Sequence, residues 1–251
     1  MMRDVLTETA SRDERLLICD CDGVLIDSEA VAARMLVREL SSRWPDADIE
    51  PVVLPLLGLR IERVLEESAA ALGKTLNAGD IESIRRSVEA AGRNAPIVDG
   101  VEAALSQIAL TKACASNSYT GYVEAVLART GLARFFGKRL FCADRVARPK
   151  PAPDVYVLAA DTLGVAREAC LVVEDSVAGV TAASAAGMPV LGFVGGGHAT
   201  REQIDALVAA GARHVFDDMR ELPALVDRWL DARLVAVRLA MDMKGDESWQ
   251  A

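Results

Sequence analysis

Two aspartates directly follow a short apolar run near the start of the chain. Residues 16–19 are typical of a strand buried on both faces, and Asp20 and Asp22 come immediately after it. Residues two apart in an extended chain point to the same side, and Gly23 lets the chain turn at once. Two carboxylates held together repel each other, so this arrangement needs a cation or a retained proton.

A second pair of acids follows another apolar run much later in the chain. Glu174 and Asp175 come after residues 170–173 and before an Ala-rich helix pattern. Asp175 by itself can be explained by the helix dipole, worth under ~1 kcal/mol, but this does not explain two separate pairs. Parallel strands end at one crevice, where Asp20, Asp22 and Asp175 would meet. An all-oxygen cluster of this kind favours a hard cation, most simply Mg²⁺.

Two other stretches of the chain carry polar groups beside predicted strands or turns. Ser116, Asn117 and Ser118 follow residues 111–115, and donors at this position suit a bound oxyanion. The same residue types are common in turns and caps, so alone they define no site. Lys150 lies between two prolines, which fix its backbone and suit a positioned charge for a phosphate or carboxylate. An exposed lysine in a proline-rich turn is the equally simple alternative.

These polar residues belong to a chain in which strand and helix patterns alternate. Strands are predicted at residues 16–19, 111–115, 139–142, 170–173, 190–193 and 214–216. Helices are predicted at residues 119–130, 152–163, 177–186 and 199–209, with one more near the C-terminus. This alternation predicts an α/β fold, a doubly wound parallel sheet with helices on both faces.

The segment between the first strand and the others has helical patterns only. Its apolar residues recur at helical spacing, and Ser28 is a good cap for a helix that runs to about residue 43. We therefore expect two domains. Residues 1–28 and 96–251 form the α/β core, and residues 29–95 form an inserted helical cap domain.

Composition narrows the classes of partner. The chain has 251 residues and a formal net charge of −9, so electrostatics do not favour nucleic acid or anionic membranes as partners. No apolar run approaches the ~20 residues of a membrane span, and the charged first 15 residues lack the apolar centre of a signal peptide. We therefore expect a cytoplasmic protein; no pattern indicates its oligomeric state. The five scattered cysteines favour buried free thiols over zinc ligands or disulfides.

Four stretches, taken in order, resemble the four motifs of the haloacid dehalogenase superfamily. They are Asp20-Cys-Asp22-Gly-Val-Leu-Ile-Asp-Ser-Glu29, Ser116-Asn-Ser118, Lys150-Pro-Ala-Pro-Asp-Val-Tyr156 and Glu174-Asp-Ser-Val-Ala-Gly179. The insertion resembles the α-helical cap of the β-phosphoglucomutase and phosphoglycolate phosphatase branch. The resemblance covers residues 14–225, to within a few residues, and implies a Rossmann-like core.

The resemblance implies a role for each of the polar groups. Asp20 is implied as the nucleophile that attacks phosphorus and forms an aspartyl-phosphate, and Asp22 as the general acid and base. Ser116 and Lys150 are implied to hold the phosphoryl oxygens, where negative charge must be stabilised.

The resemblance also implies a Mg²⁺ cofactor and a class of substrate. Asp20, Asp175 and the backbone carbonyl of Asp22 are the implied ligands, with Glu174 binding directly or through water. Dehalogenases of the superfamily lack an acid at the position of Asp22, so its presence favours a phosphate ester. The implied reaction is hydrolysis of a small phosphorylated metabolite, a sugar phosphate or a sugar-acid phosphate.

The cap must select the substrate. The substrate-binding residues are expected to include Asn117, Ser118 and Arg60. Arg60 lies where this branch places a cap loop facing the active site, so it can contact an anionic group of the substrate; a solvated arginine beside Glu62 is the alternative. The β-phosphoglucomutases typically carry lysine and asparagine where this chain has Tyr119 and Thr120, which favours a phosphatase over a mutase. A non-catalytic ligand-binding protein is a further alternative, but it predicts the loss of a nucleophile or metal ligand.

Overall fold

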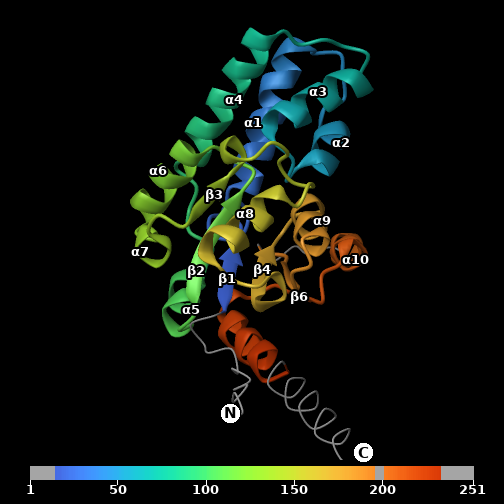
Figure 1. The fold of residues 1–251 in the computed structure, drawn as a ribbon. Coiled ribbons are helices and arrows are strands. Elements are labelled where there is room, and N and C mark those ends of the chain that lie inside the picture. Colours follow the sequence, from blue (N-terminus) through green and yellow to red (C-terminus); the bar gives the residue numbers. More distant parts are fainter. Residues whose placement is uncertain (1–14, 196–200, 233–251) are drawn as a thin grey trace, which may run out of the picture.

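A parallel six-stranded sheet forms the centre of the computed structural model, which describes residues 15–195 and 201–232 (Figure 1). The strands lie in the order β3-β2-β1-β4-β5-β6. Their bounds are β1 Leu16–Cys19, β2 Thr111–Ser116, β3 Leu140–Cys142, β4 Cys170–Glu174, β5 Val190–Phe193 and β6 His214–Phe216. Each predicted strand is present with ends that agree to within one residue, so the predicted doubly wound parallel sheet is confirmed.

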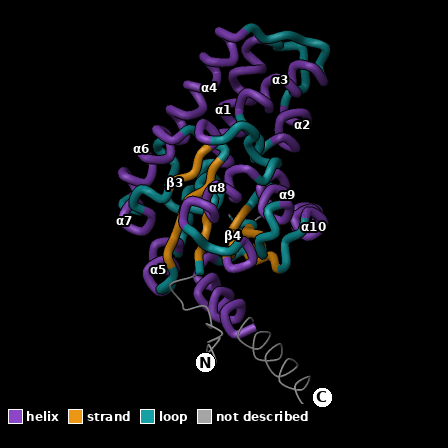
Figure 2. Tube along the Cα trace, viewed as in Figure 1, coloured by secondary structure: helices purple, strands orange, loops and turns teal. Residues whose placement is uncertain are grey.

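Helices cover both faces of the sheet, as Figure 2 shows, because the strands are apolar on both sides. In β1, Leu17 and Cys19 belong to one apolar cluster, whereas Leu16 and Ile18 belong to the other. The first cluster is covered by α5 (Val101–Gln107), α6 (Thr120–Thr130), α7 (Ala133–Phe136) and helical residues 222–232. The second is covered by α8 (Asp154–Leu163), α9 (Val177–Ala185) and α10 (Arg201–Ala210).

The central position of β1 brings the polar strand ends together. Cys19, the last residue of β1, is in register with Cys114 of β2 and Val173 of β4. The three strands are parallel, so the residues that follow these positions emerge at one edge of the sheet. Asp20 and Glu174 are therefore neighbours although they lie far apart in the sequence.

All regular secondary structure in the inserted segment is helical. Its elements are α1 (Glu29–Arg43), α2 (Glu50–Val53), the 3₁₀ helix η2 (Leu54–Leu56), α3 (Ile61–Ala71) and α4 (Ala78–Gly92). Their side chains form a third apolar cluster, which includes Leu36, Leu40, Leu65 and Ile84. In Figure 1 these helices stand beyond the carboxyl ends of the strands. This separate cluster supports the proposed division into a core and a cap of residues 29–95, and the segment is called the cap below.

Two adjacent segments of chain connect the cap to the sheet. The amide of Asp27 donates to the carbonyl of Pro96 at 2.9 Å, and the amide of Val98 donates to the carbonyl of Leu25 at 3.1 Å. The chain therefore leaves and re-enters the α/β part at a single place. Because the backbone joins the two parts only at this place, the position of the cap over the sheet also depends on side-chain contacts.

The remaining expectations about the fold concern cysteines and membrane spans. All five cysteines are buried and free, as expected. Among residues 15–195 and 201–232, no helix combines the length and the apolar character that crossing a membrane requires.

Removing side-chain volume from the cap cluster is expected to destabilise the protein. Leu65 is 0% exposed, so Leu65→Ala should lower the free energy of unfolding by about 2–5 kcal/mol through lost burial and a cavity. Leu54, also in the cap, is 44% exposed, and Leu54→Ala should change the free energy of unfolding by only about 0.5 kcal/mol or less. Chemical denaturation measures both values. Equal, small effects would show that the cap helices have no packed core.

Candidate active site

A buried lysine lies between two acids at the carboxyl edge of the sheet. Lys150 is 3% exposed, and its Nζ donates to Asp20 Oδ1 at 2.6 Å, to Glu174 Oε1 at 2.5 Å and to the Ala115 carbonyl at 2.8 Å. Burial by itself lowers the pKa of Lys150, but the charges of Asp20 and Glu174 outweigh it and hold this pKa well above its usual value. The alternative of an exposed lysine in a proline-rich turn is therefore wrong.

A third carboxylate completes a cluster around this lysine. Oxygens of Asp20, Glu174 and Asp175 lie within 4.8 Å of one another, and all three residues are buried. Burial raises the pKa of Asp20 to about 8, opposed by Lys150 and reinforced by Glu174. Burial, together with neighbouring acids, also raises the pKa of Asp175 well above its usual value. The cluster therefore holds more carboxylates than the single ammonium group of Lys150 can balance, and its all-oxygen donors fit a hard cation.

Two glycines make room for these acids. Gly23 has a φ of +79°, and a Cβ built there would lie 1.7 Å from Asp175 Oδ2. A Cβ on Gly179, in the first turn of α9, would lie 1.9 Å from Glu174 Cδ. The absence of a side chain at both positions is therefore required for the carboxylates to lie this close together. The sequence predicts a turn at Gly23 but not this close approach.

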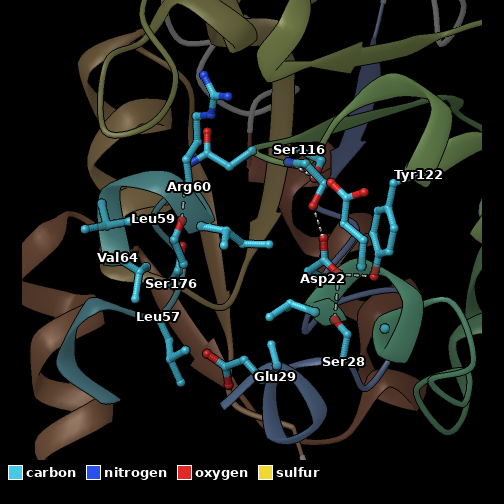
Figure 3. A pocket seen from close by; sticks show the side chains of 18 of the residues that line it. Asp22, Ser28, Glu29, Leu57, Leu59, Arg60, Val64, Ser116, Tyr122 and Ser176 are labelled. Carbon is cyan, nitrogen blue, oxygen red and sulfur yellow. Dashed lines mark hydrogen bonds between the residues drawn. The ribbon is translucent and has the colours of Figure 1, made fainter. Parts of the chain in front are cut away.

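Asp22 lies in a different environment, where three hydroxyl groups hold its carboxylate. Ser28 Oγ donates to Oδ1 at 2.6 Å, Tyr122 Oη donates to Oδ1 at 3.0 Å, and Ser118 Oγ donates to Oδ2 at 2.8 Å. Figure 3 shows Ser28 and Tyr122 converging on Asp22. Ser28 occupies the N-cap position of α1, as predicted, but its side chain makes no capping bond and binds Asp22 instead. Tyr122 is not among the predicted site residues, because no local sequence pattern indicates that its side chain contacts Asp22.

The last residue of β2 and the two residues that follow it position other groups of the site. Ser116 is 1% exposed, and its Oγ accepts a hydrogen bond from the amide of Ser118 at 3.0 Å. Asn117 Nδ2 donates to the carbonyls of Gly58 and Lys150, both at 3.1 Å, and its Oδ1 accepts from the Lys150 amide at 2.8 Å. The side chain of Asn117 therefore ties the Lys150 loop and the cap loop to the sheet, a positioning role that the sequence does not reveal.

These groups line a pocket closed on one side by the cap. Of the predicted site residues, Glu174 alone does not line it. The lining ones are Asp20, Asp22, Ser116, Asn117, Ser118, Lys150, Asp175 and Arg60. Figure 3 shows Leu57, Leu59 and Val64 of the cap across the pocket from Asp22 and Tyr122. The pocket therefore has a charged floor on the sheet and a largely apolar wall on the cap.

Arg60 is the predicted cap residue at this wall. Its Nη2 donates to Tyr119 Oη at 2.5 Å and to Glu62 Oε1 at 3.2 Å, while its buried Nε has no hydrogen-bond partner. The side chain of Arg60 is 25% exposed, pairs with Glu62 and lines the pocket.

Comparison with known proteins gives the family. Residues 14–187 match the model of the haloacid dehalogenase-like hydrolases. The chain belongs to this family. It is 28% identical over 181 residues to the 6-phosphogluconate phosphatase of Escherichia coli, covering 71% of this chain and 82% of that protein. It is 31% identical to the fructose-1-phosphate phosphatase YqaB of the same organism, covering 68% and 92%. A haloacid dehalogenase-like protein of unknown function from Agrobacterium tumefaciens superposes with a TM-score of 0.74 and 33% identity, covering 85% and 98%.

A side chain at Gly23 is expected to disturb the acid cluster more than an ordinary glycine replacement does. Gly23→Ala should cost ~1–2 kcal/mol for its left-handed backbone, plus roughly 1–3 kcal/mol for the collision with Asp175. Gly164 has a similar φ of +67° with nothing within 4 Å of a built Cβ, so Gly164→Ala should show only the first cost. Chemical denaturation of both variants gives the difference. Equal losses would mean that Asp175 does not lie against the turn at Gly23.

Proposed function

We propose that this chain is a Mg²⁺-dependent phosphatase that hydrolyses a small phosphorylated metabolite, a sugar phosphate or sugar-acid phosphate, through an aspartyl-phosphate on Asp20. The observation that carries the proposal is the buried cluster of Asp20, Glu174 and Asp175 around Lys150 at the floor of a pocket that the cap covers. Membership of the hydrolase family and the phosphatase relatives support phosphoric monoester hydrolase activity.

Asp20 is the proposed nucleophile because of how its carboxylate is held. Oδ1 accepts a hydrogen bond from Lys150, which fixes the rotation of the carboxylate while the residue lines the pocket. The other oxygen can then attack phosphorus. Asp20, Asp175 and the backbone carbonyl of Asp22 would hold Mg²⁺, with Glu174 direct or through water. When bound, the ion would shield the carboxylate nucleophile from the negative phosphate.

Asp22 is the proposed general acid and base. Its bonds from Ser28, Ser118 and Tyr122 fix the carboxylate in the pocket beside Asp20. From there it can protonate the leaving oxygen and later take a proton from the water that cleaves the aspartyl-phosphate. Ser28 directly precedes the first cap helix, so the position of the proton-transferring group depends on where the cap begins.

Ser116 and Lys150 are the proposed ligands of the phosphoryl oxygens. Both are buried at the pocket floor, where a lysine and a hydroxyl can stabilise charge on the transferring group without first being desolvated. Asn117 fixes the backbone of Lys150 on both its amide and its carbonyl. We expect this anchoring to keep the lysine aligned during turnover.

Arg60 is the proposed contact for a second anionic group on the substrate. Its buried, unpartnered Nε is a donor for a carboxylate or phosphate oxygen, although Nη2 of the same guanidinium group already donates to the carboxylate of Glu62. The relative that acts on 6-phosphogluconate supports a substrate with a carboxylate, whereas the fructose-1-phosphate phosphatase supports a plain sugar phosphate.

The other candidate functions have less support. The proposed nucleophile and all three cluster acids are present, which argues against a non-catalytic binding protein. Tyr119 stands where the mutases typically carry lysine, and its hydroxyl is bonded to Arg60 and Glu62 of the cap. This position therefore lacks the cation that would favour a bisphosphate intermediate.

Replacing the nucleophile is expected to abolish hydrolysis without unfolding the protein. Asp20→Asn should lower Mg²⁺-dependent phosphate release by at least about 10³-fold, because no carboxylate remains to attack phosphorus. The assay uses a panel that includes 6-phosphogluconate and fructose 1-phosphate. Asp161→Asn is the matched control, since the side chain of Asp161 is 64% exposed and should not matter. Full activity of Asp20→Asn on the best substrate would refute the nucleophile assignment.

A further inference from the structure

Tyr119 contacts the cap from the α/β part of the molecule. It occupies the N-cap position of α6, where its side chain makes no capping bond. Its Oη instead donates to Glu62 Oε1 at 2.8 Å and accepts from Arg60 Nη2 at 2.5 Å. Both partners lie in or next to the first turn of α3, so one hydroxyl joins the start of α6 to the start of a cap helix.

The ring of Tyr119 makes a second set of contacts with the cap. The Cζ atoms of Arg60 and Arg85 lie 5.1 Å and 4.8 Å from the ring centroid. Guanidinium groups at this distance are attracted to the ring quadrupole, by ~0.5–1 kcal/mol when partly exposed. Arg85 lies on α4 and is itself held by ion pairs with Glu82 and Glu89. Tyr119 therefore contacts residues of both α3 and α4, two helices of the cap.

The contacts of Arg60 show what this arrangement achieves. Its Nη2 is bound to Tyr119 and Glu62, whereas its buried Nε has no partner and belongs to a side chain that lines the pocket. The guanidinium group is thus fixed at one nitrogen while a second donor is unused. Glu62 belongs to the same cap segment as Arg60, whereas Tyr119 lies on a different element, at the start of α6. The tyrosine consequently fixes Arg60 relative to the sheet.

We propose that Tyr119 is a positioning residue that latches the cap onto the α/β core and aims Arg60 at the substrate. It thereby sets a preference for phosphate esters that carry a second anionic group. The preference rests on the proposed function, whereas the latch does not. The latch is supported by the contacts of Tyr119 with Arg60, Glu62 and Arg85.

The first test separates the hydroxyl from the ring. Tyr119→Phe keeps the ring beside both guanidinium groups and removes both hydrogen bonds. We expect KM for a sugar-acid phosphate, with 6-phosphogluconate as the probe, to rise about tenfold, because Arg60 loses its hydrogen bond to the hydroxyl. The kcat for this probe, and KM for fructose 1-phosphate, which has no second anion, should change less than about twofold. An equal rise in KM for both probes, or no rise for either, would overturn the proposed preference.

A double-mutant cycle tests whether Tyr119 acts through Arg60. Arg60→Gln should raise KM for 6-phosphogluconate at least as much as Tyr119→Phe, and the double variant should be no worse than Arg60→Gln alone. Additive effects would overturn the positioning role. Arg63→Gln is the control, because Arg63 lies in the first turn of α3, in an exposed pair with Glu67, and its loss should leave both KM values unchanged.

Hydrogen exchange tests the latch without any substrate. Tyr119→Ala removes hydroxyl and ring, so backbone amides at residues 57–65 should exchange faster than in the wild-type protein, while those of β4 should not change. Unchanged exchange at residues 57–65 would overturn the latch. If the wild-type protein hydrolyses neither probe, the proposed function and the substrate preference fail, and exchange alone decides whether Tyr119 holds the cap.

Discussion

The ion pairs of buried Lys150 with Asp20 and Glu174 are the interaction on which the rest of the site depends. They join the loop before α8 to the ends of β1 and β4, and the Ala115 carbonyl of β2 accepts the same ammonium group. Buried charges are stable only when they are paired and hydrogen-bonded, so these contacts fix the spacing of three strand ends. The cluster nevertheless contains three carboxylates and one lysine, and this excess of negative charge is the physical reason to expect a bound cation.

The second constraint is that the cap and the sheet share their functional groups. Asp22 is held by Ser28 at the entrance to the cap and by Ser118 and Tyr122 from the sheet side. Asn117 binds the carbonyl of Gly58 in the cap loop. The proposed proton transfer, phosphate binding and substrate choice therefore all depend on one relative placement of the two parts, because groups of both line the pocket.

Sequence patterns predict the sheet and the acid cluster well for identifiable reasons. Strands of a parallel sheet are short apolar runs, and polar residues at their ends meet by topology alone, so Asp20 and Asp175 can be placed together without coordinates. Helices α5 and α7, with 7 and 4 residues, are too short to show a periodic pattern. Local rules predict a helix cap at Ser28, but tertiary contacts redirect its hydroxyl to Asp22. The partners of Tyr119 depend on how the cap lies against α6, which no local pattern encodes.

The most direct test of the metal-dependent account is anomalous scattering from crystals grown with Mn²⁺ in place of Mg²⁺. Mn²⁺ shares the preference of Mg²⁺ for oxygen ligands and gives a signal that identifies its position. A peak is expected between the carboxylates of Asp20 and Asp175, at roughly 2.0–2.3 Å from their oxygens, and it should be lost in Asp175→Asn. If the protein hydrolyses phosphate esters with Mn²⁺ and its crystals show no peak at this cluster, the proposed metal site is wrong.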